Sequence, residues 1–166
     1  MSMKKILLAA MLSAVSVNAM AGDIYGGGGL SSNSASGADS ATGYQFFLGY
    51  DLKGVKLGKG SVAVEAGYMN SGEFDGSVCN TVPFFGVVCQ PYSVEFKGLW
   101  GTGVVFLPVA NQLDFIGRLG LDIGDDDGVM FGVGLGYAMD KKIQLRGEYV
   151  IRDTIDSLQV NIAVRF

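Results

Sequence analysis

The chain has 166 residues, no histidine and a formal net charge of −4. An acidic chain without a basic cluster is a poor candidate for nucleic-acid binding. Its mean hydropathy is +0.34 and it contains 26 glycines, whereas a soluble protein of this size is expected to show more charge and more helix-forming runs. Beyond the first residues, no apolar run approaches the length of a membrane-spanning helix. Another element must therefore account for the apolar residues.

The first 21 residues have the pattern of a secretory signal peptide. Lys4 and Lys5 form a positive start, residues 6–17 are apolar and uncharged, and Ala-Met-Ala at 19–21 offers a small-x-small cleavage site. The apolar stretch is shorter than the ~20 residues that span a bilayer, which disfavours a membrane anchor. We therefore expect cleavage after Ala21 and exclude residues 1–21 from the fold.

From residue 24 onward, apolar and polar side chains alternate in the manner of β-strands, whose side chains point to opposite faces in turn. The alternating segments, in chain order, are 24–30, 44–52, 62–68, 92–100, 113–123, 129–137, 143–152 and 158–166. The first is rich in glycine and has the weakest pattern. The fourth places Trp100 with the apolar residues Tyr92, Val94 and Phe96.

Several strands carry charge on the face opposite the apolar one. These charged residues are Glu65, Glu95, Lys97, Arg118, Arg146 and Glu148. They face either bulk water or a polar lumen, and the signal peptide, the glycines and the connection lengths favour the lumen. An even number of strands that close on themselves satisfies every backbone hydrogen bond in lipid. We therefore expect residues 22–166 to form an all-β domain, an eight-stranded antiparallel up-and-down transmembrane β-barrel.

The connections between strands differ in length. The longer ones are Ser31 to Thr42 and Asn70 to Pro91, and the shorter ones are 53–60, 108–112 and 140–141. Membrane barrels have long outer loops and short periplasmic turns, so a periplasmic N-terminus places the long segments outside the cell. Two further outer loops, 124–127 and 153–157, are short, which weakens this pattern.

Aromatic residues near the strand ends suggest two interfacial girdles, although packing in a core is an alternative. The outer set is Tyr44, Tyr68, Tyr92, Phe131 and Tyr149, and the periplasmic set is Tyr50, Phe106, Tyr137 and Phe166.

Over nearly all of residues 22–166, the chain resembles the small OmpA-like and OmpX-like outer-membrane barrels. The resemblance rests on the alternation, the strand count and the last strand, 158–166. In that family a terminal Phe with apolar residues at alternate positions is read by the barrel-assembly machinery. The matching residues are Val160, Ile162, Val164 and Phe166.

The resemblance implies a location in the bacterial outer membrane, reached through the periplasm. Outer-membrane lipid, lipopolysaccharide, periplasmic chaperones and the assembly machinery are the implied partners. Such barrels also tend to plug the lumen with paired charges, for which Glu65, Lys97, Arg118, Arg146 and Glu148 are the candidates.

The two cysteines, Cys79 and Cys89, both lie in the longest connection. An even count in an oxidising compartment suggests one disulfide, with two free thiols as the alternative. Between them lies the apolar segment 82–88, and exposed apolar patches often mark contacts. An extracellular protein partner at Asn70 to Pro91 and folding of this segment onto the barrel rim both remain open.

We expect no catalytic residues, metal or cofactor. The acidic stretch 125–127 lacks the spacing of a calcium loop and suits a hairpin turn, and the glycines at 132–136 lack the spacing of a nucleotide loop. Outer-membrane barrel enzymes use a histidine, which is absent here. The sequence favours a structural or surface-interaction protein that serves envelope integrity, adhesion or host interaction. A narrow channel and a soluble periplasmic barrel that binds an apolar ligand are the alternatives.

Overall fold

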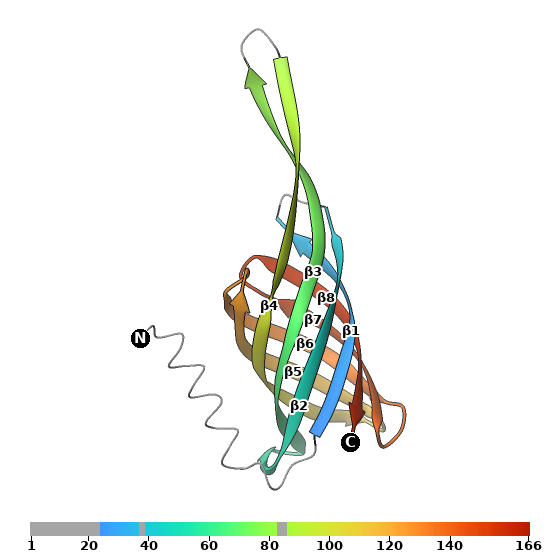
Figure 1. Ribbon diagram of the computed structural model, residues 1–166. Coiled ribbons are helices and arrows are strands. Elements are labelled where there is room, and N and C mark those ends of the chain that lie inside the picture. Colours follow the sequence, from blue (N-terminus) through green and yellow to red (C-terminus); the bar gives the residue numbers. More distant parts are fainter. Residues whose placement is uncertain (1–23, 37–38, 83–85) are drawn as a thin grey trace, which may run out of the picture.

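Eight antiparallel strands form a closed barrel in the computed structural model, which describes residues 24–36, 39–82 and 86–166 (Figure 1). The strands are β1 (Ile24–Ala35), β2 (Ala41–Leu57), β3 (Gly60–Val82), β4 (Gly86–Ala110), β5 (Leu113–Gly124), β6 (Gly128–Ala138), β7 (Ile143–Ile151) and β8 (Ile155–Arg165). Each strand pairs with its sequence neighbours, and β1 pairs with β8 to close the ring. The predicted fold is confirmed.

The expected signal peptide, residues 1–21, lies outside the described residues, as do 83–85 in the apolar segment between the cysteines. Within the described ranges, no helix has the length and apolar character needed to cross a membrane.

The apolar face of the sheet points outward. Leu48 and Leu119 are 64% and 62% exposed, whereas Arg146 and Glu148 on the opposite face are each 1% exposed. A soluble barrel would bury the leucines and expose the charges, because burial of apolar surface drives folding in water. The burial pattern therefore contradicts the alternative of a soluble barrel with an apolar interior and suits a barrel surrounded by lipid.

Three aromatic residues do not follow the predicted faces. Phe96 of β4 packs against the buried cluster of Ala41, Phe74 and Ile155. Trp100 and Phe106 of β4 were expected on the outer face, but they are buried in the lumen at 2% and 4% exposure. Thr102 and Val104 lie between them on the same inner face and are also buried. The alternation was ambiguous on β4 because both of its faces carry apolar residues.

The segment Asn70 to Pro91, expected as a loop, is instead a continuation of two strands. β3 and β4 run on beyond the barrel as a two-stranded ribbon, which stands away from the other strands in Figure 1. We call residues 73–95 the β3–β4 hairpin. The shorter segment 31–42 is also mostly strand, because β1 continues to Ala35 and β2 begins at Ala41.

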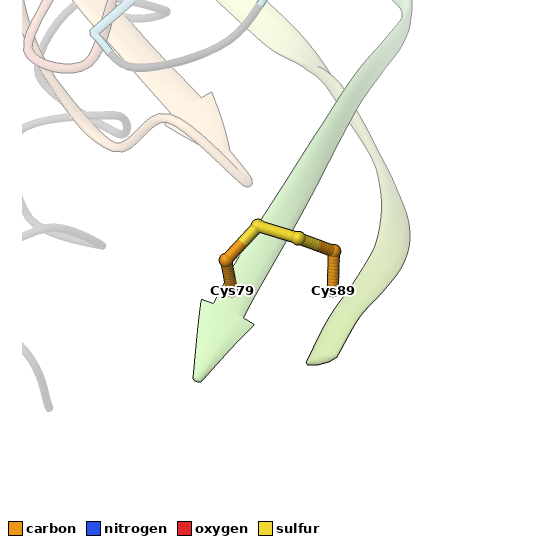
Figure 2. Close-up of a disulfide and its surroundings, with 2 residues drawn as sticks. All are labelled: Cys79 and Cys89. Atoms are coloured by element: carbon orange, nitrogen blue, oxygen red, sulfur yellow. A yellow bond between two sulfur atoms is a disulfide. The ribbon is translucent and has the colours of Figure 1, made fainter. Parts of the chain in front are cut away.

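A disulfide fixes the pairing of the β3–β4 hairpin. Cys79 and Cys89 lie directly opposite each other in the strand register and are bonded, as predicted (Figure 2). The flanking residues include β-branched Val78, Val87 and Val88, which favour strands. Polar and glycine residues nearer the barrel made this stretch resemble a loop in the sequence.

A β-bulge separates the hairpin from the barrel wall. The register shifts between Asn70 and Glu73, where Gly72 adopts a positive φ of 76° that favours glycine. Above the bulge, Phe74 faces inward and is buried, and the exposed Glu73 takes the outer side. The outer surface of β3 therefore changes from apolar to acidic at this level, which marks the end of the lipid-facing belt.

Candidate functional site

The centre of the lumen holds two carboxylates and two guanidinium groups with virtually no exposure, which we call the lumen network: Glu65, Arg118, Arg146 and Glu148. Glu65 accepts a hydrogen bond from Arg146 Nη1 at 2.5 Å and from Arg118 Nη2 at 3.1 Å. Arg118 Nη2 also lies 2.7 Å from Glu148 Oε2. The network is electrically balanced, as buried charges must be to offset the cost of leaving water.

Aromatic rings complete the surroundings of the two arginines. The Arg146 guanidinium lies 5.0 Å from the ring centre of Tyr25 and 4.9 Å from that of Phe106. Arg118 lies 5.4 Å from the ring of Trp100, and its Nε and Nη1 have no hydrogen-bond partner among the described residues. Cation–π attraction is strongest for desolvated pairs. These contacts stabilise Trp100 and Phe106 in their inward positions.

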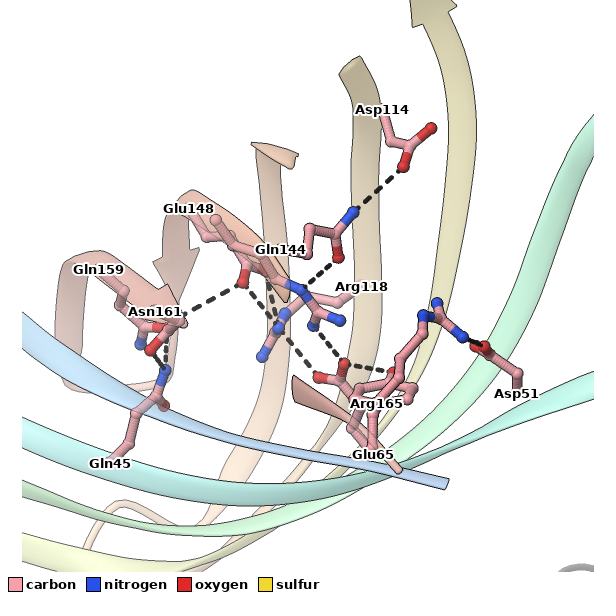
Figure 3. A network of polar contacts seen from close by, with 12 residues as sticks. Gln45, Asp51, Glu65, Asp114, Arg118, Gln144, Glu148, Gln159, Asn161 and Arg165 are labelled. Atoms are coloured by element: carbon pink, nitrogen blue, oxygen red, sulfur yellow. Dashed lines mark hydrogen bonds and ion pairs between the residues drawn. The ribbon is translucent and has the colours of Figure 1, made fainter. Parts of the chain in front are cut away.

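Side-chain amides link the lumen network to the strands on either side (Figure 3). Gln45 Nε2 donates to Gln159 at 2.7 Å and to Asn161 at 2.8 Å, and Asn161 donates to Glu148. Gln144 accepts from Arg146 and donates to Asp114. The lumen is therefore crossed by continuous polar contacts.

The outer mouth of the barrel is closed by two further groups. Arg152 Nε donates to Asp122 at 3.1 Å, and its Nη1 donates to Ser157 at 2.8 Å. Above them, Phe74 packs with Ala41 and Ile155 in a buried apolar cluster. A small cavity of about 10 Å³ lies beside Asp122, which is barely the volume that one water molecule needs.

Glu95 and Lys97, expected in the lumen with the other charges, lie elsewhere. They pair with each other at 2.9 Å near the base of the β3–β4 hairpin, with side chains 33% and 52% exposed. Because Trp100 faces the lumen, these residues fall on the outer side of β4. The hydrogen bond from Lys97 lowers the pKa of the Glu95 carboxyl, and the same contact raises the pKa of Lys97.

The structure also brings in residues that the sequence did not single out. Tyr25 donates its hydroxyl to Glu65 at 2.6 Å, and Arg152 with Asp122 forms a second ion pair. In the alternating pattern, Gln45, Gln159 and Asn161 lay on the polar face of their strands. This alternation with apolar residues predicts which face they occupy, but it does not reveal their hydrogen-bond partners.

Comparison with known proteins settles the family. Residues 7–166 match the model of the outer membrane protein beta-barrel domain. The chain belongs to this family. No curated protein matches the sequence. Membership of this family places the protein in the bacterial outer membrane.

Solved structures share the fold at low identity. Ail of Yersinia pestis in a phospholipid nanodisc is 14% identical, with a TM-score of 0.53 over 87% of this chain and 99% of that chain. Its crystal structure with the heparin analogue sucrose octasulfate is 13% identical, with a TM-score of 0.50 over 87% and 97%. A de novo designed transmembrane β-barrel is 16% identical, with a TM-score of 0.52 over 87% and 96%.

The residues of the expected assembly signal share one face of the outer membrane barrel. Val160, Ile162 and Val164 are exposed on the outer face of β8, and Phe166 follows the strand at its end. They lie on the lipid-facing side together with the other apolar strand residues.

The acidic turn of the outer membrane barrel binds backbone groups. Asp127 accepts from the Gly124 amide at 2.7 Å, Asp126 accepts from Thr154 at 2.9 Å, and Asp125 accepts from Lys97 at 3.1 Å. Across the described ranges, no group of three or more His, Cys, Asp or Glu residues is placed to hold a metal ion. The carboxylates therefore stabilise the loops at this end.

Charge is divided between the two ends of the outer membrane barrel. At the end with the hairpin, the acidic residues are Asp39, Glu73, Asp75, Glu95, Asp122, Asp125, Asp126, Asp127, Asp153 and Asp156, and the basic ones are Lys97 and Arg152. At the opposite end, the basic residues are Lys53, Lys56, Lys59, Lys141, Lys142 and Arg165, and the acidic ones are Asp51, Asp114 and Asp140. The longest connection, the β3–β4 hairpin, lies at the acidic end, and longer connections of membrane barrels are typically extracellular.

Proposed function

We propose that the protein is a surface-interaction barrel in which the wall is a membrane anchor and the β3–β4 hairpin contacts an extracellular partner. The observation that carries this proposal is the combination of a plugged lumen with a disulfide-bonded ribbon beyond the rim. An eight-stranded barrel has an interior that side chains can fill. Recognition of a partner by exposed groups therefore suits this protein better than transport through its lumen. Adhesion, host contact and envelope integrity are the roles that such recognition serves.

The exposed residues of the β3–β4 hairpin favour a partner that is both apolar and cationic. Val78, Val88, Tyr92 and Val94 alternate along the ribbon and remain between 39% and 52% exposed. Exposed apolar patches often mark interaction sites, and the carboxylates around the base of the ribbon attract positive charge. A sulfated polysaccharide, the class represented by the ligand of the Ail crystal structure, is a poor fit to this acidic end.

Removal of the hairpin tests the proposal. Replacement of residues 75–93 by Asn-Gly joins Phe74 to Val94, which are paired in the wild-type register, through a turn that favours hairpins. Phe74 remains to close the barrel mouth. We expect bacteria expressing this variant to lose adhesion to epithelial cells, while the purified barrel keeps its heat-modifiable gel migration. Undiminished adhesion by a correctly folded variant would contradict the proposal.

The sign of the charge is tested separately with the barrel in phosphatidylcholine nanodiscs. Immobilised wild-type protein is exposed to polylysine and to heparin at low salt. Because the basic opposite end is also accessible in a nanodisc, the wild type is compared with E73Q/D75N/E95Q, which removes charge only at the end with the hairpin. We expect this variant to bind less polylysine and the same amount of heparin as the wild type, with the polylysine signal falling as salt screens the charges. Unchanged polylysine binding, with heparin binding that responds to the substitutions, would exclude a cationic partner at this end.

We further propose that export and assembly use the two chain ends in the manner expected from the sequence. Cleavage after Ala21 would leave Gly22 at the start of the mature chain, and mass spectrometry of the outer-membrane protein measures this mass directly. Deletion of Phe166 is expected to reduce the amount of assembled barrel in the outer membrane, with accumulation in the periplasm. Retention of residues 1–21, or normal assembly without Phe166, would contradict the respective proposal.

A further inference from the structure

A cavity of about 440 Å³ lies at the end of the barrel where β1 begins and β8 ends. It lies between the β2–β3 connection and the inner ends of β4, β5 and β7, and we call it the periplasmic cavity. Phe106, Asp114, Gln144 and Arg165 line its inner part. These residues belong to the lumen contacts or adjoin them, so the cavity borders the polar interior of the barrel.

Positive charge lines the open side of this cavity. The segment 53–60 was expected as a connection, but β2 continues to Leu57. Lys53 and Lys56 therefore belong to the end of β2, where the strand register shifts between Asp51 and Lys56, and Lys59 lies in the turn before β3. Lys56 and Lys59 form no ion pair with other described residues. The lining therefore presents ammonium groups that are available to a ligand.

The two carboxylates of the cavity already have partners. Asp51 is paired with Arg165, and Asp114 accepts a hydrogen bond from Gln144 Nε2 at 3.1 Å (Figure 3). Neither carboxylate is therefore engaged with Lys56 or Lys59. The uncompensated charge in the cavity is positive, and an anionic ligand fits it.

The size and the remaining lining limit the ligand further. Pockets of 300–1,000 Å³ are typical of small-molecule sites, so the space exceeds a single inorganic ion. Val55, Val62 and Pro108 provide apolar surface beside the lysines. A compact phosphate ester with a short carbon skeleton satisfies both features, because lysine is a common point-charge partner of phosphate.

We propose that the periplasmic cavity binds a small organic phosphate, with Lys56 and Lys59 as the main phosphate ligands. The site is separate from the β3–β4 hairpin and is independent of the proposed surface interaction. The phosphate belongs either to a soluble ester or to the head group of a phospholipid in the adjacent leaflet.

The test uses the refolded barrel in dodecyl maltoside micelles, which contain no phosphate, titrated with glycerol 3-phosphate and followed by amide chemical shifts in NMR. The variant is K56Q/K59Q, and the matched control is K141Q/K142Q, which removes the same charge from a turn at the same end that does not line the cavity. We expect saturable shifts around Gln144 and Arg165 in the wild type. We expect about tenfold weaker binding in K56Q/K59Q, from the loss of two charge contacts, and wild-type binding in the control.

Two outcomes would overturn the proposal: absence of saturable binding to the wild type, or equal loss of affinity in the variant and the control. Equal loss would mean that only the general charge of this end attracts phosphate. A second titration in the same micelles with added phosphatidylglycerol separates the two sources. If the lipid weakens the apparent binding of glycerol 3-phosphate to the wild type but has no effect on K56Q/K59Q, the site is assigned to a lipid head group. If wild-type binding is unchanged, the site is assigned to a soluble ester.

Discussion

Replacement of Glu65 by glutamine is predicted to be one of the most damaging single changes of a charge in this barrel. Glu65 accepts hydrogen bonds from Tyr25, Arg118 and Arg146. The substitution preserves the shape of the side chain but leaves two buried guanidinium groups facing Glu148 alone. The perturbation therefore introduces one uncompensated positive charge into a closed lumen.

The expected cost follows from the burial of the partners. Removal of one member of a buried ion pair typically costs about 3 to 5 kcal/mol, because the remaining charge has lost its compensation. E65Q/R146Q restores electrical balance within the lumen network. We therefore expect the double variant to be at least about 2 kcal/mol more stable than the sum of the two single changes predicts.

Urea unfolding in phosphatidylcholine vesicles measures these differences, with extrapolation to zero denaturant. The chain has a single tryptophan, and Trp100 lies beside Arg118 in the lumen, so its fluorescence reports on the network. E95Q is the matched control, because Glu95 pairs with Lys97 outside the lumen, and we expect no measurable change. A loss below about 1 kcal/mol for E65Q, or strict additivity in the double variant, would refute the reasoning.

Three further predictions concern other parts of the molecule. G132A is expected to lower the free energy of unfolding by about 1 to 3 kcal/mol through overpacking, because a Cβ there would lie 2.7 Å from Arg118 Cγ. G147A is the control, since its Cβ would meet nothing within 4 Å. Equal unfolding midpoints of the two variants would contradict this prediction. C79S/C89S is expected to leave the urea midpoint of the barrel unchanged but to speed chymotrypsin cleavage at exposed Tyr92 in the hairpin, and an unaltered cleavage rate would show that the disulfide does not restrain the ribbon. Planar bilayers with the wild type are expected to show no stepwise conductance, because the lumen network crosses the interior, and reproducible single-channel steps would contradict a plugged lumen.

The strands were predictable because their signal is local. In β7 and β8, side-chain polarity alternates with a period of two, and this pattern can be read within each strand alone. The charged Arg146 and Glu148 identify the inner face. On β4 the same rule failed, since Leu99 and Trp100 are neighbours of similar character on opposite faces. In its inward position Trp100 contacts Arg118 of β5, a partner that the pattern of β4 alone does not contain.

The partners within the lumen were not predictable for a related reason. Glu65 and Arg146 are 81 residues apart and meet because barrel closure brings β3 and β7 to opposite sides of one narrow interior. The β3–β4 hairpin was also missed. Its strands are held by each other and by the Cys79–Cys89 bond, while the residues at its base, 71–76, have the composition of a loop.

Quenching of tryptophan fluorescence by brominated lipid tests most directly whether the apolar face of the barrel contacts lipid and the polar face lines the lumen. Trp100 is buried in the lumen, whereas Leu119 on β5 is exposed on the outer face. We predict weak quenching of the wild type and strong quenching of L119W/W100F in the same bilayers. Strong quenching of wild-type Trp100, with weak quenching of a tryptophan at position 119, would contradict the inside-out arrangement on which the account rests.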